Sequence, residues 1–152
     1  MKKFLLLAVM LLLPVFAFAD ANEKNMELLR SDLRTTKTQL LTEALEMNDA
    51  ESAKFWPIQR EYETELAKLQ DERITMIKDF AASYESMDDK KATALTNQAF
   101  KLTSQRTALL QKYTGKVSKA VSPKVAARFA QTEGYVQALV DVQVRGEVPL
   151  MH

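Results

Sequence analysis

Apolar side chains recur every three or four residues along most of this chain, and few residues that break helices interrupt them. Beyond residue 19, glycine and proline occur only at Gly115, Gly134, Gly146, Pro57, Pro123 and Pro149. Strands joined by tight turns need more of both residue types, because glycine and proline supply the backbone angles of such turns. A spacing of three and four residues marks one face of an α-helix. The sequence therefore predicts an all-α protein.

The apolar positions form four successive stripes. The first contains Met26, Leu29, Leu33, Thr36, Leu40, Ala44 and Met47. The second contains Tyr62, Leu66, Leu69, Arg73, Met76, Phe80 and Tyr84. The third contains Leu95, Ala99, Leu102, Arg106, Leu109, Tyr113 and Val117. The fourth contains Val121, Val125, Phe129, Thr132, Val136 and Val140. These stripes predict four amphipathic helices over about residues 23–46, 48–86, 88–120 and 122–145.

Capping residues stand at three of the predicted helix starts. Asn48 followed by Glu51 forms a capping-box pair, which satisfies backbone N–H groups that have no partner within the helix. Asp88 precedes the third helix in the same way. Ser122 followed by Pro123 places a cap before a proline at the first helical position, where the missing N–H is harmless.

The predicted lengths imply an elongated, curved helical hairpin with a long central antiparallel pair. A helix over residues 48–86 would run almost ~60 Å at ~1.5 Å per residue. Pro57 lies inside it and removes one backbone hydrogen bond, so we expect a bend there. The chain would turn back near Met87. Gly146 suits the position just after the last helix, with Pro149 preventing its resumption.

The first nineteen residues have the pattern of an export signal. Lys2 and Lys3 precede an apolar run over residues 4–18, and small residues at Ala17 and Ala19 mark a cleavage site before Asp20. We therefore expect a cleaved signal peptide over residues 1–19 and a single all-helical domain over residues 20–152 in the periplasm. No stable membrane insertion is expected after cleavage.

Charge and residue usage exclude several classes of function. Removing Lys2 and Lys3 leaves 19 basic against 20 acidic residues, so nucleic acid is not an expected partner. The sequence has no cysteine, and its one histidine is the terminal His152, so no thiolate, catalytic triad or helical metal pair can be assembled. The acidic clusters alternate with basic residues at the spacing of surface ion pairs. We expect no enzyme, cofactor or metal site.

Arg73 and Arg106 interrupt otherwise apolar stripes. If the second and third helices fold back near Met87, Arg106 lies roughly opposite Leu69, within reach of Glu65 or Glu72. A buried guanidinium requires such a partner, so one interpretation is a structural ion pair that fixes the register of the hairpin. A second interpretation is a side chain whose stem lies along the stripe while its charged head remains in water. A third is a site for anionic groups of a ligand or client.

Aromatic residues supply the remaining candidates for a binding surface. Phe55 and Trp56 are neighbours and point about 100° apart on a helix, so we expect one of them to be exposed, or to meet a second subunit or another helix. Tyr62 follows on the apolar stripe. Core filling is the alternative use. With the two arginines, the predicted client- or partner-binding residues are Phe55, Trp56, Tyr62, Arg73 and Arg106.

The segments that open two of the predicted helices resemble a known family. Residues 47–51 (MNDAE) and 87–91 (MDDKK) look like altered copies, forty residues apart, of an apolar-Thr-x-x-Gln motif. That motif marks the Spy/CpxP-type periplasmic proteins, also called LTxxQ-motif proteins. Residues 53–57 (AKFWP) with Tyr62 are also similar to exported proteins near this family. The resemblance implies a helical hairpin that dimerises into a curved cradle and holds unfolded proteins without ATP under envelope stress.

Two other non-enzymatic functions remain open. One is an accessory or regulatory adaptor, responsive to metal or stress, that binds a single envelope partner. The other is a structural protein whose hairpin pairs with an envelope complex or whose helices touch lipid, although lipid binders usually carry a strongly basic face. A hairpin of this length leaves one helix face uncovered, so a homodimer is expected in each case.

Overall fold

Four α-helices and one short 3-10 helix make up the described part of the chain, which contains no strand. The computed structural model describes residues 23–151, and side chains from residue 34 onward. The helices are α1 (Glu23–Leu45), α2 (Asp49–Ser83), η3 (Tyr84–Ser86), α3 (Asp89–Ala120) and α4 (Pro123–Glu147). The predicted all-α class is confirmed, whereas the predicted signal peptide over residues 1–19 lies outside the described residues.

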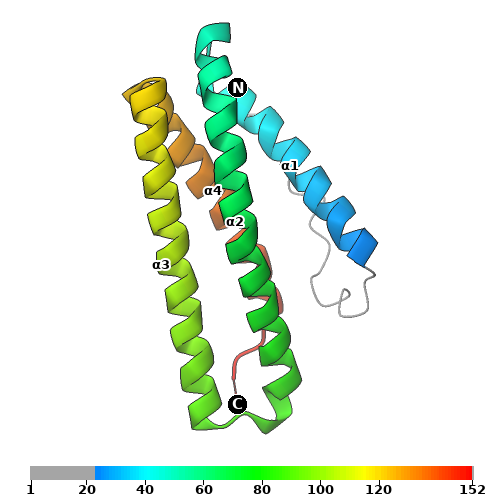
Figure 1. Cartoon of the computed structure of the whole chain (residues 1–152). Coiled ribbons are helices and arrows are strands. Elements are labelled where there is room, and N and C mark those ends of the chain that lie inside the picture. Colours follow the sequence, from blue (N-terminus) through cyan, green and yellow to red (C-terminus); the bar gives the residue numbers. More distant parts are fainter. Residues whose placement is uncertain (1–22, 152) are drawn as a thin grey trace.

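Helices α2 and α3 form the predicted long antiparallel hairpin (Figure 1). With 35 and 32 residues, they run about 50 Å each at ~1.5 Å per residue. Helix α4 returns along α3 behind the hairpin, so that the C-terminus comes close to the α2–α3 turn. Helix α1 packs against α4 and diverges from the other helices towards its N-terminal end.

The predicted N-terminal caps are confirmed. Asn48 Oδ1 accepts a hydrogen bond from the Glu51 N–H at 2.9 Å, and a Glu51 carboxylate oxygen accepts the Asn48 N–H at 3.1 Å, which completes the capping box. Asp88 caps α3. Ser122 caps α4, with Pro123 in its first turn. Local sequence therefore fixes where three helices begin.

Two helix ends differ from the prediction by two or three residues, and the predicted place of Gly146 after the last helix was wrong. Helix α4 continues to Glu147, so Gly146 lies in its last turn without a positive φ. The helix ends because Val148 is extended, at φ −88° and ψ 116°, as a residue before Pro149 prefers. Helix α2 stops at Ser83, and the following turn tightens into η3 before Met87 becomes extended.

The core lies in one half of the molecule, where the N-terminal half of α2 meets the C-terminal half of α3 and the start of α4. Its centre is an aromatic cluster in which Phe129 packs edge-to-face against Phe55 and Tyr62, with ring centroids 5.7 and 5.5 Å apart. Tyr62 also packs against Tyr113 at 5.5 Å. All of these rings are buried, so this cluster is the main source of apolar burial.

The buried face of α1 is shifted by one residue from the predicted stripe. Leu41 and Leu45 are fully buried, whereas the predicted Leu40 and Ala44 are only partly covered. The shift arises because α1 packs mainly against α4, an arrangement that periodicity alone does not specify. Met26, Leu29 and Leu33, which the prediction placed on the same stripe, are not among the residues whose side chains the structure describes.

Ion pairs fix the register of the hairpin on its outer surface. Lys112 Nζ lies 2.8 Å from a Glu65 carboxylate oxygen, and Lys116 Nζ lies 2.7 Å from a carboxylate oxygen of Glu61. The two pairs are one helical turn apart on both helices, as an antiparallel pair requires. All four side chains are largely exposed, so these pairs contribute little stability individually.

Replacing Phe129 with Ala should remove the ring shared by Phe55 and Tyr62 and leave a cavity. We expect this substitution to lower the free energy of unfolding by about 3–5 kcal/mol, measured by urea denaturation followed by circular dichroism. The matched control is Val142→Ala on the same helix, where the side chain is 74% exposed and the change should stay within about 0.5 kcal/mol. Equal effects of the two substitutions would show that the core is placed wrongly.

Candidate functional site

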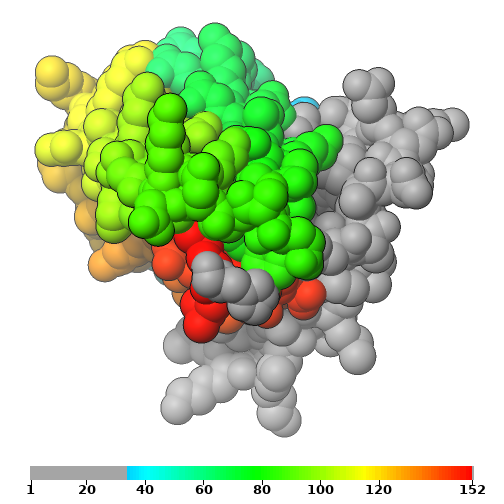
Figure 2. All heavy atoms as spheres, turned by 90° about the horizontal axis from the view of Figure 1, so that it is seen from below, coloured from blue at the N-terminus to red at the C-terminus, as the bar shows by residue number. Residues whose placement is uncertain are grey.

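The half of the hairpin beyond the core contains an open apolar groove of about 620 Å³. It is lined by residues from 66–80 of α2, 95–106 of α3, 137–145 of α4 and the C-terminal segment 148–151. Figure 2 shows that segment, in red, lying against the ends of α2 and α3, in green. Most of the lining side chains are aliphatic or aromatic. We refer to this feature as the apolar groove.

Phe100 gives the apolar groove its most accessible aromatic side chain. It lies on α3, borders the groove and is 68% exposed. Leu95 and Leu102, on either side of it in the sequence, are buried in the groove floor. An exposed ring beside a recessed apolar floor is a feature of surfaces that bind other polypeptides.

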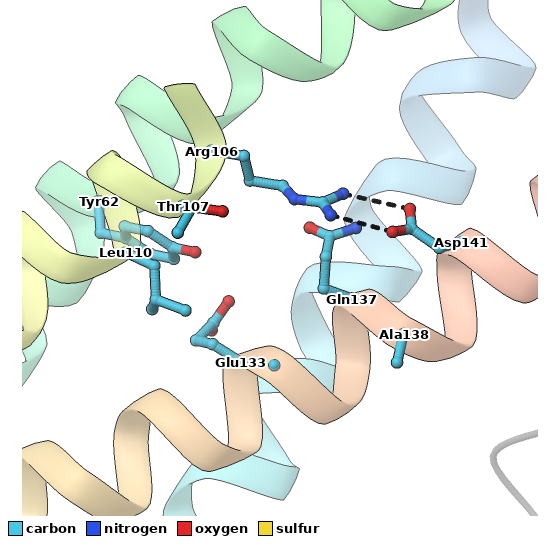
Figure 3. A pocket seen from close by; sticks show the side chains of 9 residues that line it. Tyr62, Arg106, Thr107, Leu110, Glu133, Gln137, Ala138 and Asp141 are labelled. Atoms are coloured by element: carbon cyan, nitrogen blue, oxygen red, sulfur yellow. Dashed lines mark hydrogen bonds and ion pairs between the residues drawn. The ribbon is translucent and has the colours of Figure 1, made fainter. Parts of the chain in front are cut away.

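Two arginines and one aspartate meet where the core ends and the apolar groove begins. Arg73 Nη1 donates to Asp141 Oδ1 at 2.7 Å, and Arg106 donates to both carboxylate oxygens, at 3.1 and 2.9 Å (Figure 3). Burial opposes ionisation, but the two arginines outweigh it and hold the pKa of Asp141 below its ordinary value. The cluster joins α2, α3 and α4.

The predicted partner of Arg106 was wrong. The expected register, with Arg106 roughly opposite Leu69, is close to the register that the Glu65–Lys112 pair sets. Glu65, however, accepts hydrogen bonds from Lys112 and Tyr113, and Arg106 binds Asp141 of α4. The prediction considered only the hairpin, whereas α4 places its carboxylate between both arginines. The interpretation as a structural ion pair therefore holds with a different acid.

A second polar cluster lies inside the core end of the bundle. Lys37 of α1 forms ion pairs with Glu63 of α2 and with Glu133 of α4, the latter at 2.8 Å. Glu133 is buried, and its Oε1 has no hydrogen-bond partner among the described residues. Burial raises the pKa of Glu133, although Lys37 opposes the shift. Burial and the nearby Glu133 carboxylate also raise the pKa of Tyr62 far above its ordinary range.

A smaller pocket of about 240 Å³ separates this cluster from the arginines. Figure 3 shows Tyr62, Glu133 and Gln137 around it, with Arg106 and Asp141 at one end. The cluster around Glu133 holds α1 against α2 and α4 through Lys37.

The structure divides the predicted binding residues into two groups. Phe55 and Tyr62 are buried in the aromatic cluster, and Trp56 is half-buried against the core, so neither neighbour of the Phe55–Trp56 pair is fully exposed. None of these three lines the apolar groove, whereas Arg73 and Arg106 do.

Sequence reasoning missed Phe100 and Asp141. Phe100 lies next to Ala99 of the third stripe, off the buried face, and a large aromatic at such a position was the available signal. Asp141 follows the last apolar position of the fourth stripe, and nothing in its local sequence distinguishes it from an ordinary surface acid.

Among residues 23–151, no group of acidic, histidine or cysteine side chains has the arrangement of a metal site. Over the same described range, no helix has the length and apolar character required to cross a membrane.

In comparisons with known proteins, no family model matches the chain, and no curated protein or solved structure gives a significant match.

The raised pKa of Glu133 predicts a specific pH dependence of stability. The folded protein holds this proton more tightly than the unfolded chain, so lowering the pH between the two pKa values stabilises the fold. The wild type should therefore gain stability as the pH falls from about 7.5 towards the ordinary glutamate pKa of about 4.5. The Glu133→Gln variant cannot bind this proton, so its gain in stability over the same range should be smaller. Urea denaturation across this range measures the effect, and parallel curves for the two proteins would contradict it.

Proposed function

We propose that this protein is an exported, ATP-independent holdase that binds unfolded or aggregation-prone proteins in the periplasm. The observation that carries the proposal is the apolar groove, which is open to solvent and bordered by the exposed Phe100. An open apolar surface with few directional polar groups accepts many sequences and requires no cofactor. The predicted export signal and the sequence resemblance to Spy/CpxP-type proteins support the same proposal.

The construction of the molecule suits weak, adaptable binding. The aromatic core stabilises one half of the hairpin, while the other half leaves Phe100, Met76 and Leu150 beside the groove. Methionine and aromatic side chains adapt to partners of different shape at low cost. A client segment can therefore cover the groove without rearrangement of the core.

A second candidate function is that of an adaptor for one envelope partner. Val142 and Tyr135 of α4 are 74% and 41% exposed, and neither lines the apolar groove. They offer a separate apolar surface on which a dedicated partner or a second copy of this chain can dock. This function is non-enzymatic as well.

Light scattering tests the holdase proposal directly. A chemically unfolded, unrelated protein is diluted into buffer with and without residues 20–152, in the absence of nucleotide and at several molar ratios. We expect scattering to be suppressed near one dimer per client. No suppression at large excess would contradict the proposal and favour a dedicated partner, to be sought by crosslinking in cells.

Phe100→Ser assigns the activity to the apolar groove. The side chain is exposed, so the free energy of unfolding should change by no more than about 0.5 kcal/mol. Several-fold more of this variant than of the wild type should be needed to suppress the light scattering of the client to the same extent. Tyr135→Ser is the matched control, because it removes an exposed aromatic side chain of α4 outside the groove. A larger loss of suppression in the Tyr135 variant would place client binding on α4 instead.

A further inference from the structure

We infer that the apolar groove selects polypeptide segments in which an acidic residue accompanies apolar side chains. The inference rests on the proposed function and specifies its client class. Its basis is the charge of the groove lining, which contains Arg73, Arg106 and Arg145 against the single acid Asp141. A mainly apolar surface therefore carries a net charge of +2, whereas the chain as a whole is close to neutral.

The paired arginines leave part of this positive charge uncompensated. Arg73 and Arg106 both bind Asp141, so one carboxylate serves two guanidinium groups. Their side chains are 23% and 25% exposed, and both line the groove. A guanidinium has five N–H donors, more than the shared carboxylate can accept. A client carboxylate can bind here as a second acceptor.

Arg145 extends the cationic surface along the edge of the groove. It lies one helical turn after Asp141 on α4, is exposed, and forms no ion pair with any described residue. An acidic side chain of a client bound along the groove would pass between Arg145 and the arginine pair. A lysine at the same point would face three arginines and a single carboxylate that both paired arginines already bind.

The apolar residues around the arginines indicate a ligand that is larger than a small anion and partly apolar. Leu69, Leu102 and Val144 line the groove together with the arginines, so a charge bound there is partly removed from water. Electrostatic attraction is stronger in such a setting than on an open surface. Apolar side chains adjacent to the acid would fill the floor, and this combination describes a polypeptide segment with an acidic residue.

Three fluorescently labelled peptides test the inference on residues 20–152. They share one apolar sequence of about ten residues and differ only at a central Glu, Gln or Lys. By fluorescence anisotropy, we expect the Glu peptide to bind about 3- to 10-fold more tightly than the Gln peptide and the Lys peptide to bind most weakly. The advantage of Glu should shrink as salt is raised.

Two substitutions attribute the preference to the groove. Arg145→Gln should reduce the Glu advantage, measured as the ratio of the affinities for the Glu and Gln peptides, at least twofold. The matched control is Lys124→Gln, which removes an exposed charge at the other end of α4. An equal effect of the Arg145 and Lys124 variants would mean that net charge alone acts, which overturns the inference.

The outcomes separate this inference from the proposed function. Equal affinity for all three peptides, with scattering still suppressed, overturns the acidic selectivity and leaves the holdase intact. If no peptide binds and scattering is not suppressed, both the acidic selectivity and the holdase proposal are overturned. Dodecanoate, an apolar chain with a carboxylate, is tested alongside. Its binding in the absence of any peptide binding would overturn the peptide assignment and indicate a lipid ligand instead.

Discussion

The ion-pair cluster of Arg73, Arg106 and Asp141 is the constraint on which the rest of this architecture depends. Two arginines on the facing stripes of α2 and α3 would leave two cations at the hairpin interface, and the carboxylate of α4 gives both a partner. The cluster therefore fixes α4 against the hairpin. It also interrupts apolar packing at that level, so the continuous core ends there and the apolar groove begins.

The two halves of the molecule consequently have different physical roles. The aromatic cluster around Phe129 provides the buried apolar area that stabilises the fold, and Lys37 attaches α1 to this half through Glu63 and Glu133. The groove half has recessed apolar side chains that no helix of the described residues covers, together with positively charged edges. Because stability resides mainly in the first half, substitutions such as Phe100→Ser can change binding without unfolding the protein.

This separation explains which sequence-based expectations about the site succeeded. A stripe of apolar residues predicts that a position is covered, and Tyr62, Leu109 and Val117 are buried accordingly. The same stripe does not show where the covering helices end. Phe55 and Tyr62 therefore belong to the core rather than to a surface, while Arg73 and Arg106 do line the groove. Phe100, beside the stripe, remains exposed because no helix within residues 23–151 covers it.

The sequence by itself determined the all-α class, the starts of α2, α3 and α4, and the α2–α3 hairpin with approximately its register. These features depend on local interactions: helical periodicity, side-chain caps at Asn48, Asp88 and Ser122, and a turn that joins neighbouring helices. Only the tertiary structure decided that α1 buries Leu41 and Leu45 against α4, and that Asp141 is the acid between the arginines. Those outcomes depend on how helices distant in sequence pack, because amphipathic periodicity specifies which face is buried but not what covers it.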